Sequence, residues 1–123
     1  MKVKWGVIGA GGIADRRTIP GMMMAKNVEL VSVMEVNMEF AEKLRKKYNA
    51  KRAYDNIDKM LEDPEIDAVY IATPVIYHKE QALKAAKAKK HILIEKPVAL
   101  TTGEGKDIGD ICRKEGVLIS VGF

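Results

Sequence analysis

Residues 3–14 read VKWGVIGAGGIA, an apolar run to Ile8 followed by a glycine-rich turn. Gly9, Gly11 and Ala14 occupy the first, third and sixth places of the fingerprint G-x-G-x-x-G/A, which is typical of dinucleotide-binding folds. The first glycine permits a tight turn, the second lets a pyrophosphate approach the backbone, and the small alanine lets the next helix pack closely on the sheet. Free N–H groups and the positive end of the helix dipole then favour a bound phosphate.

An acidic residue follows the second apolar run. Residues 29–34, ELVSVM, predict a strand, and Glu35 comes directly after it. The fingerprint places such an acid about 20 residues beyond the glycines, and a slightly longer first helix and loop explains the later position here. A carboxylate at this point accepts hydrogen bonds from ribose hydroxyls and repels a 2′-phosphate. The sequence therefore favours NAD as the cofactor, with NADP less favoured.

Composition agrees with one globular domain. The chain has 123 residues, of which 47% are hydrophobic, and no run approaches the about 20 apolar residues of a membrane span. The N-terminus enters a strand without a signal-like segment, and Cys112 is the single cysteine, so we expect a cytoplasmic protein without an intramolecular disulfide. The net charge of +4 comes mostly from residues 43–52 and 84–90. These segments lack interleaved aromatic residues and predict solvated helix faces rather than a nucleic-acid interface.

Strand-like and helix-like segments alternate along the whole chain. The predicted strands are residues 3–8, 29–34, 52–54, 66–73, 91–95 and 117–123, and the predicted helices are residues 13–25, 38–48, 56–62, 77–89 and 101–114. Pro20 and Gly21 should interrupt the first helix, Gly116 should cap the last one, and Cys112 should lie in the core. Residues Phe40, Leu44 and Tyr48 fall on one face of the second helix.

This alternation predicts an α/β fold, a doubly wound parallel Rossmann sheet with six strands in the order 3-2-1-4-5-6 and helices on both faces. In such sheets the ligand binds beyond the carboxyl ends of the strands, where the strand order reverses. We therefore expect the loops that follow Ile8, Met34, Ala72 and Ile94 to meet in one cleft.

Several motifs in order give the chain a family resemblance. They are Ile71-Ala72-Thr73-Pro74, His78, Lys90-His91-Ile92-Leu93-Ile94 and Glu95-Lys96-Pro97. With the glycine loop they make the chain resemble the Gfo/Idh/MocA family, which includes glucose-fructose oxidoreductase and inositol dehydrogenase. The resemblance extends from the glycine loop to Val121-Gly122-Phe123, and the combination is far more specific than any single motif.

The resemblance implies an NAD-dependent oxidoreductase that transfers a hydride between the nicotinamide and a sugar, polyol or related hydroxyl compound. Lys96 would be the catalytic residue, close to the nicotinamide and the substrate hydroxyl, with no metal involved. The predicted cofactor-binding residues are Gly9, Gly11, Gly12, Ile13, Ala14, Glu35, Ala72, Thr73, Pro74, His78, Glu95 and Lys96. For His78 two interpretations stay open, an approach to the nicotinamide end or a place in the first turn of its helix. We interpret His91 as structural.

The chain departs from the family pattern at a few positions. Members commonly carry Asn where this chain has Val75, Gly where it has Lys89, and in some cases a positive charge where it has Val36. Members also continue beyond the equivalent of Phe123 into a substrate domain that supplies further catalytic residues and the oligomer interface. We therefore expect residues 1–123 to be the dinucleotide-binding domain alone, without that C-terminal domain, with little or no turnover and a tendency to form homo-oligomers.

Other functions share part of this pattern. A non-catalytic NAD-binding or redox-sensing module would need the glycine loop and Glu35 but not Lys96. A methyltransferase would use a similar loop and acid for adenosylmethionine, again without the Lys96 segment. A nucleic-acid-binding role rests only on the basic helices and is the weakest alternative.

Overall fold

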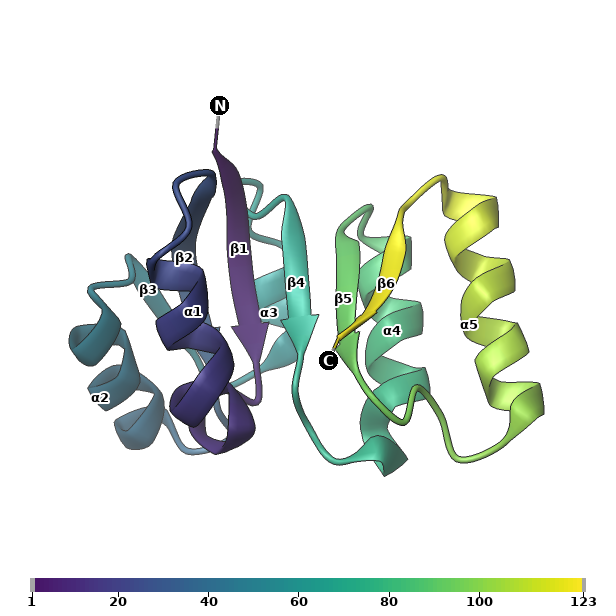
Figure 1. Cartoon of the computed structure of the whole chain (residues 1–123), viewed down its shortest axis with the longest axis horizontal. Coiled ribbons are helices and arrows are strands. Elements are labelled where there is room, and N and C mark those ends of the chain that lie inside the picture. Colours follow the sequence, from purple (N-terminus) through teal and green to yellow (C-terminus); the bar gives the residue numbers. More distant parts are fainter. Residues whose placement is uncertain (1, 123) are drawn as a thin grey trace.

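The computed structural model describes residues 2–122, except for the side chain of Ile13. Six parallel strands form one sheet in the order β3-β2-β1-β4-β5-β6, which confirms the predicted topology (Figure 1). The strands are β1 (Val3–Ile8), β2 (Val28–Met34), β3 (Arg52–Tyr54), β4 (Ala68–Ile71), β5 (His91–Glu95) and β6 (Ile119–Gly122). The order reverses between β1 and β4, so the loops after these two strands diverge and leave a crevice at their carboxyl ends.

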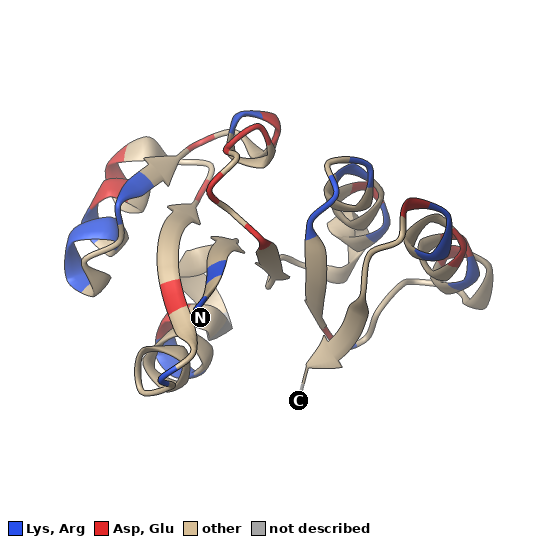
Figure 2. Cartoon of the chain, turned by 90° about the horizontal axis from the view of Figure 1, so that it is seen from above, with Lys and Arg blue, Asp and Glu red and all other residues tan. Residues whose placement is uncertain are grey.

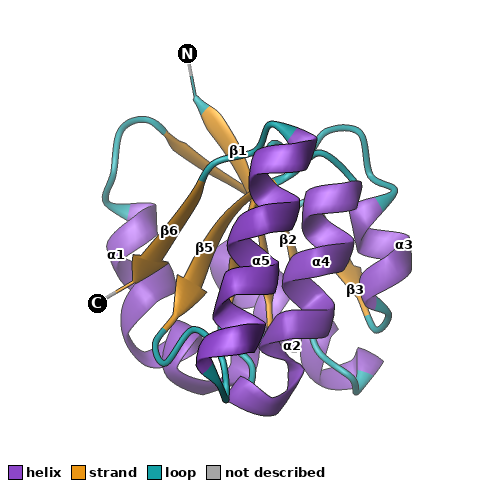
Figure 3. Ribbon diagram, turned by 90° about the vertical axis from the view of Figure 1, so that its right-hand side faces the viewer, coloured by secondary structure: helices purple, strands orange, loops and turns teal. Residues whose placement is uncertain are grey.

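Helices cover both faces of this sheet, as predicted (Figure 3). One face carries η1 (Ala10–Thr18), α1 (Ile19–Met23) and α2 (Met38–Tyr48). The other face carries α3 (Ile57–Leu61), α4 (His78–Lys87) and α5 (Thr102–Glu115), with the short turn η2 (Val75–Tyr77) leading into α4. In the part of the chain that the structure describes, no helix is both long and apolar enough to cross a membrane.

The first helical segment differs from its predicted bounds. η1 begins at Ala10, three residues before the predicted start, and Gly12 interrupts it with the non-helical angles φ −100° and ψ −122°. Pro20 and Gly21 were expected to interrupt this helix, but Thr18 and Ile19 both have right-handed helical angles, and η1 runs directly into α1. The Ile19 N–H donates to the Ala14 carbonyl, five residues earlier, so the missing N–H of Pro20 falls where the hydrogen-bonding pattern changes.

Side chains and special backbone angles mark the other helix ends. The side-chain oxygens of Asn37, Asn56 and Thr101 accept N–H groups at the starts of α2, α3 and α5. Gly116 ends α5 in the left-handed conformation, with φ 71°, as predicted. Lys89 also has a left-handed φ of 64°, a conformation that favours glycine.

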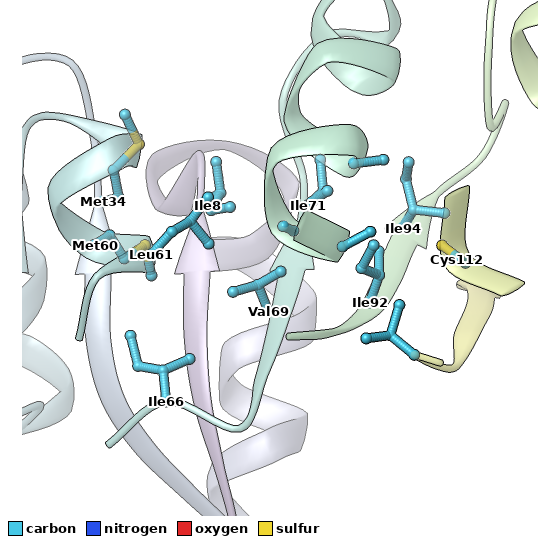
Figure 4. Close-up of a cluster of buried hydrophobic side chains, with 14 of the residues drawn as sticks. Ile8, Met34, Met60, Leu61, Ile66, Val69, Ile71, Ile92, Ile94 and Cys112 are labelled. Carbon is cyan, nitrogen blue, oxygen red and sulfur yellow. The ribbon is translucent and has the colours of Figure 1, made fainter. Parts of the chain in front are cut away.

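The core consists of two apolar clusters, one on each face. The larger one runs from Met60 and Leu61 of α3, across Ile71 and Ile94 of the sheet, to Cys112 of α5 (Figure 4). Cys112 is 2% exposed, which confirms its place in the core. The cluster on the opposite face joins residues of η1, α1 and α2 to Val7, Val33 and Tyr70.

The last strand begins two residues later than predicted. The Val117 N–H donates to the Cys112 carbonyl at 3.0 Å and so completes the end of α5 before β6 starts at Ile119. Phe123, the final residue of the predicted strand, lies outside the described residues. The predicted strand 66–73 is likewise shorter, because Ile66 closes a turn onto the Asp63 carbonyl.

Charged side chains gather where the strands begin, at the amino edge of the sheet. Lys51 Nζ lies 2.5 Å from the Glu65 carboxylate, and Arg52 pairs with both Glu65 and Asp63. The buried Lys90 ammonium donates to two backbone carbonyl groups, each at 2.8 Å. We call these five residues the amino-edge network. Along the outer helices α2 and α5, acidic segments lie beside basic ones, the pattern of solvated helix faces (Figure 2).

Candidate cofactor site

A cleft of about 480 Å³ opens at the carboxyl edge of the sheet, beside the point where the strand order reverses. The loops after β1, β2 and β4 form it, as predicted, whereas the loop after Ile94, which was expected to join them, contributes no lining residue. It is lined by Gly9, Gly12, Met34, Glu35, Val36, Ala72, Thr73, Pro74, Tyr77 and Gln81. Six of these were predicted cofactor-binding residues, namely Gly9, Gly12, Glu35, Ala72, Thr73 and Pro74.

At the start of the glycine turn, Gly9 leaves no room for a side chain. Gly9 adopts the left-handed angles φ 78° and ψ 50°, and its N–H donates to the Met34 carbonyl at 3.0 Å. A Cβ atom at Gly9 would lie 2.7 Å from Cγ2 of Thr73, so the turn and the β4 loop touch. Gly12, in contrast, is exposed, and a Cβ atom there would have no neighbour within 4 Å. Gly12 therefore presents open backbone to the cleft.

Glu35 connects the end of β2 to the glycine turn. Its Oε2 atom accepts the Gly11 N–H at 2.6 Å, so the predicted acid and the predicted turn are in direct contact. The ring of Phe40, in the first turn of α2, lies against Gly11 and occupies the space that a Cβ atom would need. Phe40 is 40% exposed, whereas Leu44 and Tyr48 of the same helix face are buried. A side chain at Gly11 would therefore collide with this ring and crowd the Glu35 carboxylate.

Two residues on the far wall of the cleft were not predicted. Tyr77 is half-exposed at the end of η2, and Gln81 follows one turn later on α4. The Thr73 hydroxyl donates to the Gln81 side-chain oxygen at 2.5 Å. Their four-residue spacing after the Thr-Pro turn places them on one helix face, which was the available signal in the sequence.

His78 lies beneath the cleft rather than in its wall. It is 1% exposed, and its Nε2 atom is 2.8 Å from the Thr73 carbonyl oxygen. The Nδ1 atom is 3.0 Å from the Pro97 carbonyl and 3.1 Å from the Val98 carbonyl. The ring therefore joins the loop after β4 to the loop after β5. Of the two open interpretations, its place in the first turn of α4 is observed, and its approach to the nicotinamide end stays a prediction.

Glu95 and Lys96, at the end of β5, have different surroundings. The Glu95 Oε2 atom accepts a hydrogen bond from the Tyr70 hydroxyl at 2.9 Å and lines a second cleft, together with Thr18, on the α1 side of the sheet. Lys96 is exposed, precedes a cis peptide bond to Pro97, and makes no ion pair within residues 2–122. Neither residue lines the first cleft.

Three further predicted residues lie in or beside the glycine turn. Ala14 is fully buried against the sheet, as expected of the sixth fingerprint position. Ile13 belongs to η1, but its side chain lies outside the described part of the structure. Ala72 donates its N–H to the Ile8 carbonyl at 2.9 Å and so holds the β4 loop beside the glycine turn.

The geometry suits an extended anionic ligand with a sugar. The start of η1 brings the positive end of a helix dipole to the cleft, and exposed Gly12 permits close approach of a phosphate. Glu35 supplies a carboxylate acceptor at the rim, and apolar or uncharged residues form the far wall. These residues fit a dinucleotide, which would bring redox chemistry that no side chain of the cleft supplies.

Known proteins show the same organisation. Over residues 3–123 the chain matches the family described as "Oxidoreductase family, NAD-binding Rossmann fold", the Gfo/Idh/MocA family. Glucose-6-phosphate 3-dehydrogenase of Bacillus subtilis is 38% identical over 120 residues, which are 98% of this chain and 33% of that protein. The 1,5-anhydro-D-fructose reductase of Ensifer adhaerens is 34% identical over 116 residues, which are 94% of this chain and 34% of that protein.

A solved structure agrees with these sequence matches. KijD10, a 3-ketoreductase from Actinomadura kijaniata in complex with TDP-benzene and NADP, superposes with a TM-score of 0.95 at 26% identity. The match covers 100% of this chain and 39% of that one. The chain thus spans about a third of the length of the curated relatives named above. It belongs to the Gfo/Idh/MocA oxidoreductase family and forms the NAD(P)-binding Rossmann domain of that family.

Proposed function

We propose that this domain binds NAD, with the adenosine ribose on Glu35, the pyrophosphate over Gly12 and the nicotinamide directed toward the Lys96 loop. The contact between the Glu35 carboxylate and the Gly11 N–H carries this proposal. It supports the proposal because the acid that would accept the ribose hydroxyls lies beside the turn that would bind the pyrophosphate, at the edge where the strand order reverses.

The charge of the cleft supports NAD over NADP. A 2′-phosphate beside Glu35 would meet a carboxylate, and none of the lining residues is Lys or Arg. Val36, which follows the acid, is 83% exposed and offers no hydrogen bond. The KijD10 structure contains NADP, so membership of the family leaves both cofactors open.

For the reaction we propose hydride transfer to or from a sugar or polyol. Bound nicotinamide supplies the hydride chemistry. The Lys96 amine takes up or returns the proton of the substrate hydroxyl, a role for which its exposed position at the end of β5 leaves it accessible. The glucose-6-phosphate 3-dehydrogenase and 1,5-anhydro-D-fructose reductase among the relatives are named for sugar substrates.

The direct test is a titration of the chain with NADH and, separately, with NADPH. Binding is followed by energy transfer from Trp5, the single tryptophan, which lies in β1 upstream of the glycine turn. We expect saturable binding that favours NADH. Equal affinity would overturn the assigned role of Glu35, and failure of a folded chain to bind either nucleotide would overturn the proposed site.

Activity separates this proposal from a non-catalytic NAD-binding or redox-sensing module. We propose that residues 1–123 alone have little or no turnover, because the family resemblance puts further substrate-binding and catalytic residues in another domain. Robust polyol oxidation by the purified 123-residue protein would contradict this. We also propose a cytoplasmic, homo-oligomeric protein without a nucleic-acid partner, to be checked by fractionation, light scattering and DNA titration.

A further inference from the structure

Three side chains form a hydrogen-bonded chain at the end of β5, in which Tyr70 is buried and Thr18 and Glu95 are half-buried. Tyr70 of β4 is 0% exposed, and its hydroxyl contacts the Glu95 carboxylate at 2.9 Å and the Thr18 hydroxyl at 3.0 Å. Tyr70 donates its single proton to Glu95, so Thr18 must donate to the Tyr70 oxygen. The two hydrogen bonds therefore point in one direction, from Thr18 at the end of η1 through Tyr70 of β4 to Glu95 at the end of β5.

The Tyr70 hydroxyl is not needed to fill the core. A phenylalanine ring would pack between Val7, Ala14 and Ile19 without a polar atom to satisfy. Burial, together with the neighbouring Glu95 carboxylate, raises the pKa of Tyr70 to about 12 despite the Thr18 hydrogen bond. The hydroxyl thus remains a donor at all physiological pH values, and its one acceptor is Glu95.

Glu95 is fixed by more than this bond. It is the last residue of β5 and pairs with Gly122 of β6. Its Oε2 atom would lie 3.4 Å from a Cβ atom at Gly122, so the half-buried carboxylate lies close to Tyr70 of β4 and to Gly122 of β6. Lys96 follows immediately, and fixing the Glu95 side chain therefore limits where the next peptide can lie.

The other face of the sheet holds the same turn. His78 of α4 contacts the carbonyl groups of Pro97 and Val98, while Tyr70 packs with the η1 and α1 residues. The Lys96–Pro97 segment is thus attached before and after Lys96, by side chains from opposite faces. Lys96 itself stays exposed.

We propose that Tyr70 and Thr18 are positioning residues that fix the Lys96 turn through Glu95 and so set the nicotinamide end of the cofactor site. This inference rests on the proposed function. Tyr70 is fully buried, and neither it nor Thr18 lines the cofactor cleft, so both act only through Glu95.

The test compares NADH with ADP-ribose, which lacks the nicotinamide. NADH binding is followed by energy transfer from Trp5, and ADP-ribose binding by its displacement of NADH. We expect the wild-type chain to prefer NADH, and Tyr70→Phe to reduce that preference by about two- to tenfold, the range that corresponds to one hydrogen bond. Thr18→Val should act in the same direction, and Thr18→Ser, which keeps the hydroxyl, should restore the preference.

Tyr54→Phe is the matched control. The Tyr54 hydroxyl also donates to a carboxylate, that of Asp63 at 2.9 Å, but β3 lies at the opposite side of the sheet from β5. A purely structural role would lower the unfolding temperature in both Tyr variants and leave both preferences unchanged. If Tyr70→Phe fails to fold, the Thr18 pair decides.

The outcomes separate the two proposals. An unchanged preference in Tyr70→Phe and Thr18→Val overturns the positioning role while NADH binding stands. A wild-type chain that binds NADH and ADP-ribose equally also overturns it, because the Lys96 turn then contributes nothing to nicotinamide binding. A folded chain that binds neither ligand overturns the proposed function first.

Discussion

The two edges of the sheet treat their polar groups in opposite ways. At the amino edge, Lys51, Arg52 and Lys90 are each bound to carboxylate or carbonyl oxygens. At the carboxyl edge, Gly12 opens onto empty space and Lys96 is exposed. The three cations at the amino edge are thus bound to oxygen atoms, whereas Gly12 and Lys96 at the carboxyl edge are open to solvent. We expect ligand binding at the carboxyl edge, where polar groups are exposed and the backbone around them is held by hydrogen bonds.

The carboxyl edge is itself divided. Its β1–β2 half consists of backbone turns and one carboxylate, in the contact between Gly11 and Glu35. Its β4–β5 half is held by buried side chains, His78 and Tyr70. The first half is suited to recognise a constant ligand part through N–H groups, and the second to orient a reactive group.

The largest expected effect comes from the glycine turn. Gly9→Ala should cost about 1–2 kcal/mol for the left-handed conformation and about 1–3 kcal/mol more for crowding against Thr73. NADH binding should be lost with it, since the proposed pyrophosphate site lies on this turn. Gly21→Ala is the control, because Gly21 has open space around it and no positive φ. Urea unfolding should show this control equal to or more stable than wild type; equal losses in both variants would contradict the assignment.

The next largest loss of stability is expected from substitution of His78, with His91 as the comparison. His78→Phe removes the imidazole N–H, so the carbonyl oxygen of Thr73 or those of Pro97 and Val98, according to the tautomer, lose their donor, and unsatisfied buried groups cost about 1–3 kcal/mol. His91 is exposed at the amino edge and accepts one N–H, from Leu118 at 3.0 Å. We expect His91→Phe to cost less in thermal unfolding and to leave NADH affinity unchanged. If both variants weaken NADH binding equally, His78 has no special role at the carboxyl edge.

A third prediction concerns Glu35. Glu35→Gln keeps an oxygen that can accept the Gly11 N–H but removes the charge, so the fold should persist. Because hydrogen bonds to charged groups are worth about 1.5–3 kcal/mol, the preference for NADH over NADPH should fall by about tenfold or more. Glu62→Gln, an exposed acid after α3, removes the same charge as a control. If both variants lose the preference for NADH over NADPH equally, that preference comes from the net charge of the whole domain and not from Glu35.

Local patterns explain how much of this the sequence predicts. The Gly9 turn, the acid after β2 and the helix Met38–Tyr48 each depend on residues close together in the chain, and all were predicted. The ends of the elements were less accurate: η1 begins three residues earlier than predicted, and β4 and β6 begin two residues later because turn hydrogen bonds precede them.

The β4–β5 half of the site could not be predicted in the same way. Tyr70 and Glu95 are 25 residues apart, and His78 and Pro97 are 19 apart, so no periodicity relates them. Phe40 has the spacing of a core residue in α2, yet its ring lies on Gly11 because it comes in the first turn, beyond the edge of the core. Such contacts depend on which loops the topology brings together.

The smallest expected effect is confined to the amino edge and appears in acid. Hydrogen bonds from Lys51 and Arg52 lower the pKa of Glu65 to about 2. Burial opposes ionisation of Asp63, but the Glu65 N–H, Arg52 and Tyr54 hold its pKa below the usual range. Because these pKa values are depressed on folding, the stabilisation is present above the ordinary carboxyl range near about pH 4 and is lost as the pH falls toward about 2.

Arg52→Gln should therefore lower the unfolding temperature at neutral pH and reduce its further fall in acid. Solvent screens these partly exposed pairs, so the change should be smaller than that of any variant above. NADH affinity at neutral pH should stay unchanged, since Arg52 does not line the cofactor cleft. Arg113→Gln, which removes an exposed pair with Asp110 on α5, should alter neither property. Weaker NADH binding in Arg52→Gln would show that β3 transmits changes between the edges, and the two edges would then be one coupled unit.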